Sequence, residues 1–245
     1  METRTLILFL SELVGAIAVT LLLTLSPRFK RGRAVQFARP RQEGLFGLGV
    51  AVLLGLAAYA FLRGPGASLT YDETTLAGLG VRLGIGAAAL LVVALILRLR
   101  KHPLSSVRWS RPMLMPGVQL GLAVGFLTLF LRNILPELFK GITMDQGYAL
   151  LVWLGIALAE ESLFRGYVQL RLEAWLGERW GWLAASGLST LWLLLFIGGQ
   201  PLSALLPRLG LLLLQALVLG WMAQRSRGVL GGAIYRAMSG WLMMF

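Results

Sequence analysis

Two adjacent carboxylates followed by an arginine form the pattern in this chain that is best suited to chemistry. Glu160 and Glu161 precede Arg165, and on a helix Glu161 and Arg165 are four residues apart with the acid first, the favourable order for an ion pair. Two carboxylates in a poorly solvated place cannot both ionise cheaply, so we expect Arg165 to hold one and leave the other as a general base. Such a base can take a proton from water and drive hydrolysis of an amide bond. On spacing alone, a buried structural ion pair and a transporter relay remain alternatives.

The residues available for any other chemistry are few. The chain of 245 residues has no Cys and one His, His102, which excludes disulfides, thiolate nucleophiles and metal sites built from several Cys or His ligands. Two Glu side chains alone make a poor site for a transition metal, and hard cations prefer more oxygen ligands. We therefore expect no cofactor and no metal. His102 lies in a basic segment, residues 98–111, where we expect it at the surface.

The elements that must position the carboxylates are predicted to be membrane-spanning helices. Hydrophobic residues make up 57% of the chain and charged residues 14%, which is too apolar for an ordinary soluble domain. Crossing a bilayer takes roughly 20 mostly apolar residues. We predict an all-α polytopic membrane helix bundle, one domain over residues 1–245, with about eight transmembrane helices at residues 5–25, 45–62, 76–97, 117–135, 148–168, 181–197, 204–223 and 229–245.

The net charge of +12 is interpreted as a topology signal. One alternate set of connections between the predicted spans holds fifteen Lys and Arg residues and the other set holds four. Basic residues near spans stay on the cytoplasmic side, so both termini are expected outside, in a bacterial-type plasma membrane. Membrane lipid is the expected partner of the basic residues, and nucleic acid is not expected.

Charges and glycines inside the predicted spans indicate how the helices pack. An ionisable group at membrane depth costs at least about 2.5 to 3.5 kcal/mol, so it normally faces the protein interior and is paired. The candidates are Glu12, Arg82, Glu160, Glu161, Arg165, Arg208 and Arg236. Glycines spaced four residues apart let helix backbones approach closely, and they occur at Gly80 and Gly84 and at Gly117, Gly121 and Gly125.

The segment from Glu160 to Arg165, followed by Gly-Tyr-Val-Gln-Leu, resembles the first signature of the CAAX protease and bacteriocin-processing family, also called the CPBP or Abi family. The resemblance covers residues 145–245. It implies that Glu160 is the catalytic base, that Glu161 and Arg165 support it, and that the family activity is cleavage of peptide bonds within the membrane. It also implies a peptide or prenylated peptide as the substrate.

The chain departs from the family pattern at both histidines. The second family motif best matches residues 192–196 and places Phe196 where the family has His; the third best matches residues 236–240 and places Arg236 there. Phe196 cannot orient a water molecule by a hydrogen bond. Arg236 can donate hydrogen bonds to an oxyanion, but a permanent cation beside Glu160 weakens it as a base. The simplest interpretation is that Arg236 pairs with Glu160 or Glu161.

Three functions follow from this combination of match and mismatch. The favoured hypothesis is a degenerate member of the family, a pseudoenzyme that acts as a membrane scaffold or as a subunit of a complex with a membrane protein partner. The alternative is an active glutamate-dependent intramembrane peptidase in which Arg236 has replaced a family His. A weaker alternative is a transporter that uses Glu12, Glu160 and the buried arginines.

Overall fold

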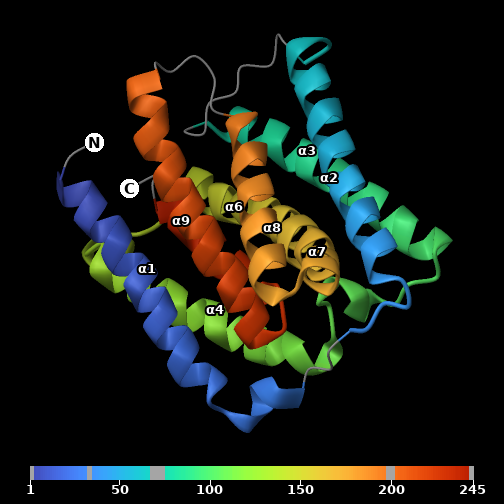
Figure 1. The fold of residues 1–245 in the computed structure, drawn as a ribbon. Helices are drawn as coiled ribbons and strands as arrows, with labels where there is room; N and C mark the ends of the chain where they lie inside the picture. The colour runs from blue at the N-terminus through green and yellow to red at the C-terminus, as the bar shows by residue number, and fades with distance from the viewer. Residues whose placement is uncertain (1–2, 32–34, 67–74, 197–201, 243–245) are drawn as a thin grey trace.

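The computed structural model describes residues 3–31, 35–66, 75–196 and 202–242, and within these ranges the regular structure is entirely helical (Figure 1). Short 3-10 helices cover Pro27–Arg31 and Leu104–Val107, and a π-helical turn covers Ser162–Val168. The α-helices are α1 (Thr3–Thr24), α2 (Pro40–Arg63), α3 (Leu76–Leu99), α4 (Arg111–Leu131), α5 (Leu135–Phe139), α6 (Met144–Glu161), α7 (Gln169–Leu176), α8 (Glu178–Leu194), α9 (Leu202–Ser226) and α10 (Leu230–Trp241).

The prediction of an all-α polytopic membrane bundle is confirmed, and the protein is an integral membrane protein. Six helical segments in the described part of the chain are long and apolar enough to cross a bilayer, rather than the eight expected. They are Leu6–Thr24, Pro40–Arg63, Leu76–Leu99, Leu104–Leu131, Met144–Leu176 and Leu205–Ser226. The two remaining predicted spans contain α8, of 17 residues, and α10, of 12 residues, which are shorter than a typical transmembrane helix.

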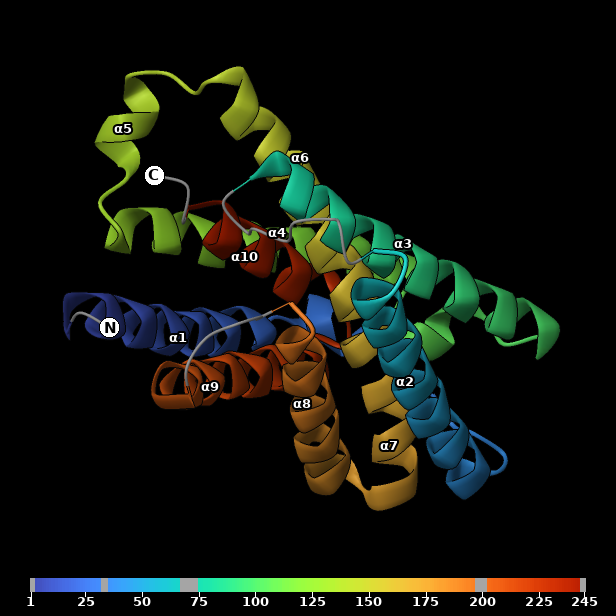
Figure 2. The same cartoon turned by 90° about the horizontal axis from the view of Figure 1, so that it is seen from above.

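A long central helix carries the candidate residues. It consists of α6, the π-helical turn and α7 in succession, and it begins at a capping box in which Thr143 and Gln146 satisfy each other's backbone N–H groups. Helices α3 and α10 pack against α6, and α2 and α8 pack against α7 (Figure 2). Helix α10 also packs on α4, while α1 and α9 lie side by side at the edge of the bundle. The middle of the central helix is therefore enclosed by other helices.

The two series of glycines differ in whether they bring neighbouring helices into close contact. A methyl group added at Gly117 would lie 3.0 Å from Leu230 Cβ, and one at Gly121 would lie 2.5 Å from Ile234 Cβ, so α4 and α10 approach closely along this series. At Gly80 and Gly84 an added methyl would meet no atom within 4 Å. Close packing was thus predicted correctly for the α4 series, and the same prediction was wrong for the α3 series.

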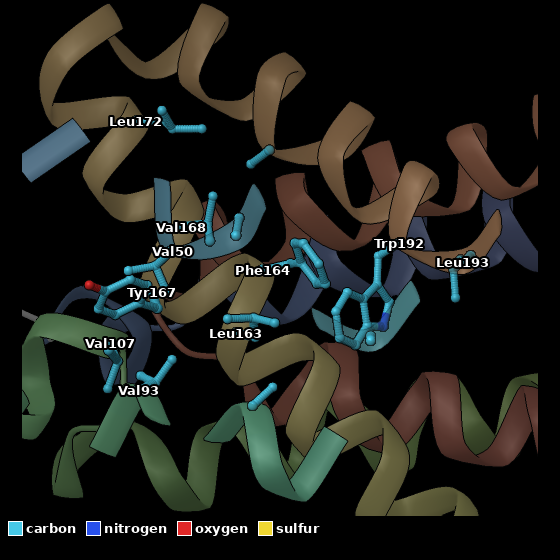
Figure 3. Close-up of a cluster of buried hydrophobic side chains, with 14 of the residues drawn as sticks. Val50, Val93, Val107, Leu163, Phe164, Tyr167, Val168, Leu172, Trp192 and Leu193 are labelled. Atoms are coloured by element: carbon cyan, nitrogen blue, oxygen red, sulfur yellow. The ribbon is translucent and has the colours of Figure 1, made fainter. Parts of the chain in front are cut away.

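A buried apolar cluster surrounds the π-helical turn and the start of α7 (Figure 3). Leu163, Phe164, Tyr167 and Val168 from this turn are each at most 2% exposed. The ring of Phe164 lies edge-on to the indole of Trp192 on α8, with 5.7 Å between the ring centroids (Figure 3). This packing fixes the helix directly after the two glutamates.

Candidate functional site

The π-helical turn that follows Glu161 accepts hydrogen bonds from the loop before α4. Trp109 Nε1 donates a hydrogen bond to Ser162 Oγ at 3.0 Å, and the Arg108 guanidinium donates to the carbonyl of Arg165 at 3.0 Å. A methyl group at Gly166 would lie 2.5 Å from the carbonyl oxygen of Val107, so the loop and the turn touch through a position that only glycine fills. π-Helical turns occur frequently at functional sites, because the extra residue changes which side chains face inward.

Glu160 lies on the inner side of α6 between two arginines from other helices. Arg82 of α3 forms a fork on its carboxylate, with Nε 2.7 Å from Oε1 and an Nη atom 2.9 Å from Oε2. Arg236 of α10 donates to Oε2, and Trp192 Nε1 donates to Oε1 at a long 3.4 Å. A carboxylate has about four lone-pair positions, and these four donors occupy them. The spacing of Glu161 and Arg165 assigned no partner to Glu160, and Arg82 supplies one from a helix distant in sequence.

Glu161 has a less complete set of partners. Arg236 donates to its Oε1 at 3.0 Å, so a single guanidinium joins both glutamates. The predicted ion pair with Arg165 is present, with Nε 3.5 Å from Oε2, but this distance is longer than a good hydrogen bond. Among the described residues, Glu161 Oε2 and Arg165 Nε and Nη1 have no hydrogen-bond partner. Arg165 donates instead through Nη2 to Ser189 Oγ on α8 at 3.0 Å.

The two residues predicted to stand at the family histidine positions, Phe196 and Arg236, lie at this site with different contacts. Arg236 pairs with both carboxylates, as the simplest interpretation predicted. Phe196 lies on the apolar side: the Arg82 guanidinium carbon is 5.3 Å from the Phe196 ring centroid, and Trp192 stacks edge-on against the same ring. His102 lies elsewhere, partly buried with its Nε2 3.5 Å from Glu43 Oε1, so it is not the solvated surface residue that we expected.

Sequence reasoning missed two members of the site. Arg82 was recognised as an intramembrane charge, but nothing in its spacing links α3 to Glu160, 78 residues later. Trp192 was noted only as part of a motif match, and its indole N–H contacts the carboxylate. Three arginines and two glutamates thus meet in a place where every one of them is at most 9% exposed. In the described part of the chain, no group of three or more His, Asp or Glu side chains could hold a metal ion.

A comparison with known families identifies the C-terminal part of the chain. Residues 145–242 match the family model described as type II CAAX prenyl endopeptidase Rce1-like. These residues form an Rce1-like domain. The predicted relationship to the CPBP family is thereby confirmed, and the protein contains a domain like that of an intramembrane protease. No curated protein and no solved structure matches the chain significantly.

The Rce1-like domain contains most, but not all, of the charged site. It extends from the first turn of α6 to the end of α10 and includes Glu160, Glu161, Arg165 and Arg236. Arg82, whose guanidinium donates hydrogen bonds to both carboxylate oxygens of Glu160, lies on α3 outside the matched residues. The N-terminal helices therefore contribute a charged side chain to the centre of the domain.

Proposed function

We propose that this Rce1-like protein has no peptidase activity and serves as a membrane scaffold or as a subunit of a membrane complex. The observation that supports the proposal is the occupation of the Glu160 carboxylate by Arg82, Arg236 and Trp192. A general base must hold a water molecule or a substrate proton through a free lone pair. Glu160 lacks such a lone pair unless one of its donors leaves.

The cost of freeing Glu160 is large in this environment. Arg82 and Arg236 are buried at 4% and 9% exposure, and the loss of a partner leaves a buried charge without compensation. Breaking a buried ion pair in this way typically costs about 3–5 kcal/mol. A catalytic cycle would have to meet that cost before any bond is cleaved, which favours a structural role for the cluster.

One observation favours the alternative function of an active peptidase. Glu161 Oε2 has no hydrogen-bond partner among the described residues and lies 3.5 Å from Arg165 Nε. In that alternative, Glu161 is the base, and Arg236 holds the developing oxyanion in the place of a family His. The two functions differ in which glutamate matters for cleavage.

The scaffold function is supported by an apolar groove on the edge of the bundle. It has a volume of about 440 Å³ and lies between α1 and α4, which approach closely at Gly15, where an added methyl group would lie 2.6 Å from Leu127 Cδ2. The larger lining residues come from α1 and α4 and are Ile7, Leu10, Val14, Leu127 and Leu131. We place a contact with large apolar side chains of a membrane protein partner on this groove.

The test is a cleavage assay with purified protein and a library of membrane peptides, with and without a prenylated C-terminus. Wild type, Glu160→Gln, Glu161→Gln and the exposed control Glu137→Gln are expected to be equally inactive. Cleavage by wild type that is lost only in Glu161→Gln would establish the alternative, and loss only in Glu160→Gln would refute our assignment of that residue. Isolation from native membranes as a monomer without a stoichiometric partner would contradict the scaffold function.

A further inference from the structure

A second apolar pocket lies between α2 and α3 and ends at the charged site. Its volume is about 450 Å³, and among the described residues Trp192 is the only one from outside these two helices that lines it. Ala57, Ala58, Gly84, Ala88 and Ala89 make the pocket possible, because their small side chains leave the space between the helices unfilled. The other lining residues are Leu54, Phe61, Val81, Ile85 and Val92.

The pocket is continuous with the surface that faces lipid. Helices α2 and α3 both belong to the segments long and apolar enough to span a bilayer. Phe61 and Val92 line the pocket and are also 40% and 39% exposed. Large apolar residues adjacent in sequence to lining residues, Leu53 before Leu54 and Leu91 before Val92, are 68% and 72% exposed. Hydrocarbon chains of the bilayer therefore have direct access to the pocket.

The size of the pocket indicates that its occupant is a hydrocarbon chain rather than an α-helix. The lining residues run from Leu54 to Phe61 on α2 and from Val81 to Val92 on α3, which correspond to lengths of about 10 and 16 Å at the helical rise of 1.5 Å per residue. A 10 Å length of α-helix with its side chains, about 10 Å wide, would occupy roughly 800 Å³. The pocket offers little more than half of that volume, so it cannot enclose a length of helix, whereas a single extended hydrocarbon chain is narrow enough to enter it.

We propose that this pocket binds an acyl chain of a membrane phospholipid. The chain lies along α2 and α3 and touches the indole of Trp192. That indole donates to Glu160 and packs against Phe164 and Phe196, so the bound chain borders the carboxylate cluster through a single side chain. The proposal does not depend on whether the Rce1-like domain cleaves peptides.

The test uses the space at two glycines on the same helix. Gly84 lines the pocket and Gly80 does not, yet an added Cβ meets no atom within 4 Å at either position. Gly84→Leu fills the pocket, while Gly80→Leu adds the same side chain one turn away. Each protein is reconstituted in phosphatidylcholine vesicles that contain a phosphatidylcholine with a diazirine on one acyl chain, and labelled peptides are mapped after illumination.

The expected result is labelling of the peptides containing residues 54–61, 81–92 and Trp192 in wild type and in Gly80→Leu, and its loss in Gly84→Leu. Ala88→Leu, which fills the same pocket, gives the same loss if Gly84→Leu does not fold, as judged by its thermal unfolding midpoint. Equal labelling of all folded variants would overturn the proposal. Labelling by a diazirine-bearing isoprenoid alcohol, with none by phosphatidylcholine, would overturn the choice of a phospholipid chain.

Discussion

Two glutamates of this protein each lie between two arginines, but in different surroundings. Glu160 is held by Arg82 and Arg236 in the middle of the bundle. Glu43, near the start of α2, accepts from the Arg100 guanidinium at 2.5 Å and from Arg171 Nε at 3.2 Å. Both carboxylates are at most 5% exposed. The same ionic arrangement is therefore used twice, at different depths.

The difference lies in the access of the arginines to solvent. The Arg82 side chain is 4% exposed and lies against the rings of Trp153 and Phe196, whereas the Arg100 side chain is 34% exposed at the end of α3. Arg100 can turn towards water if Glu43 is lost, and Arg82 cannot. Arg171 is fully buried, but it also donates to the carbonyls of Ser106 and Tyr167. Arg82 thus depends on Glu160 to compensate its charge, whereas Arg100 has water as an alternative to Glu43.

The largest effect is expected when the central carboxylate is removed. Glu160→Ala leaves Arg82 and Arg236 with only Glu161 for compensation, and the free energy of unfolding should fall by about 3–5 kcal/mol. The measurement is equilibrium unfolding of the purified protein in bicelles. The double variant Glu160→Ala with Arg82→Met should recover part of that loss, because it removes the uncompensated charge. No recovery in the double variant would mean that Arg82 is stable without its carboxylate.

A smaller effect is expected at the peripheral cluster. Glu43→Ala removes the charged hydrogen bonds to Arg100 and Arg171, and one such bond is worth about 1.5–3 kcal/mol. The total loss should stay near the value for one bond, because Arg100 can turn towards water and Arg171 keeps its hydrogen bonds to the carbonyls of Ser106 and Tyr167. The same unfolding experiment in bicelles provides the comparison. If Glu43→Ala proves as damaging as Glu160→Ala, solvent access of Arg100 does not explain the difference between the clusters.

The smallest effect is expected from the single histidine. His102 Nε2 lies 3.5 Å from Glu43 Oε1, and its ring stacks edge-on against Phe37, but Arg100 and Arg171 already hold that carboxylate. His102→Ala should lower the free energy of unfolding by less than about 1 kcal/mol. A loss comparable to that of Glu43→Ala would show that His102 is a principal partner of Glu43.

The outline of the fold and part of the site could be predicted from local sequence. Hydropathy located the long apolar helices, and the spacing of Glu161 and Arg165 predicted their ion pair, because both depend on residues within one helix. Two of the eight predicted spans correspond to α8 and α10, which in the described part of the chain are apolar but shorter than a typical transmembrane helix. The glycine spacing was ambiguous, since Gly121 packs against α10 while Gly84 faces open space with the same local pattern.

The sequence by itself determined that this is a helical membrane protein with two adjacent glutamates. It also predicted that Phe196 and Arg236 stand where the family it resembles has histidines. Only the tertiary structure decided that the Arg82 guanidinium donates to both oxygens of Glu160 and that the Arg236 guanidinium donates to both glutamates. The physical reason is that hydropathy and helical spacing are properties of one segment. The partner of a buried charge is instead set by which helices meet, and that depends on packing along their whole length.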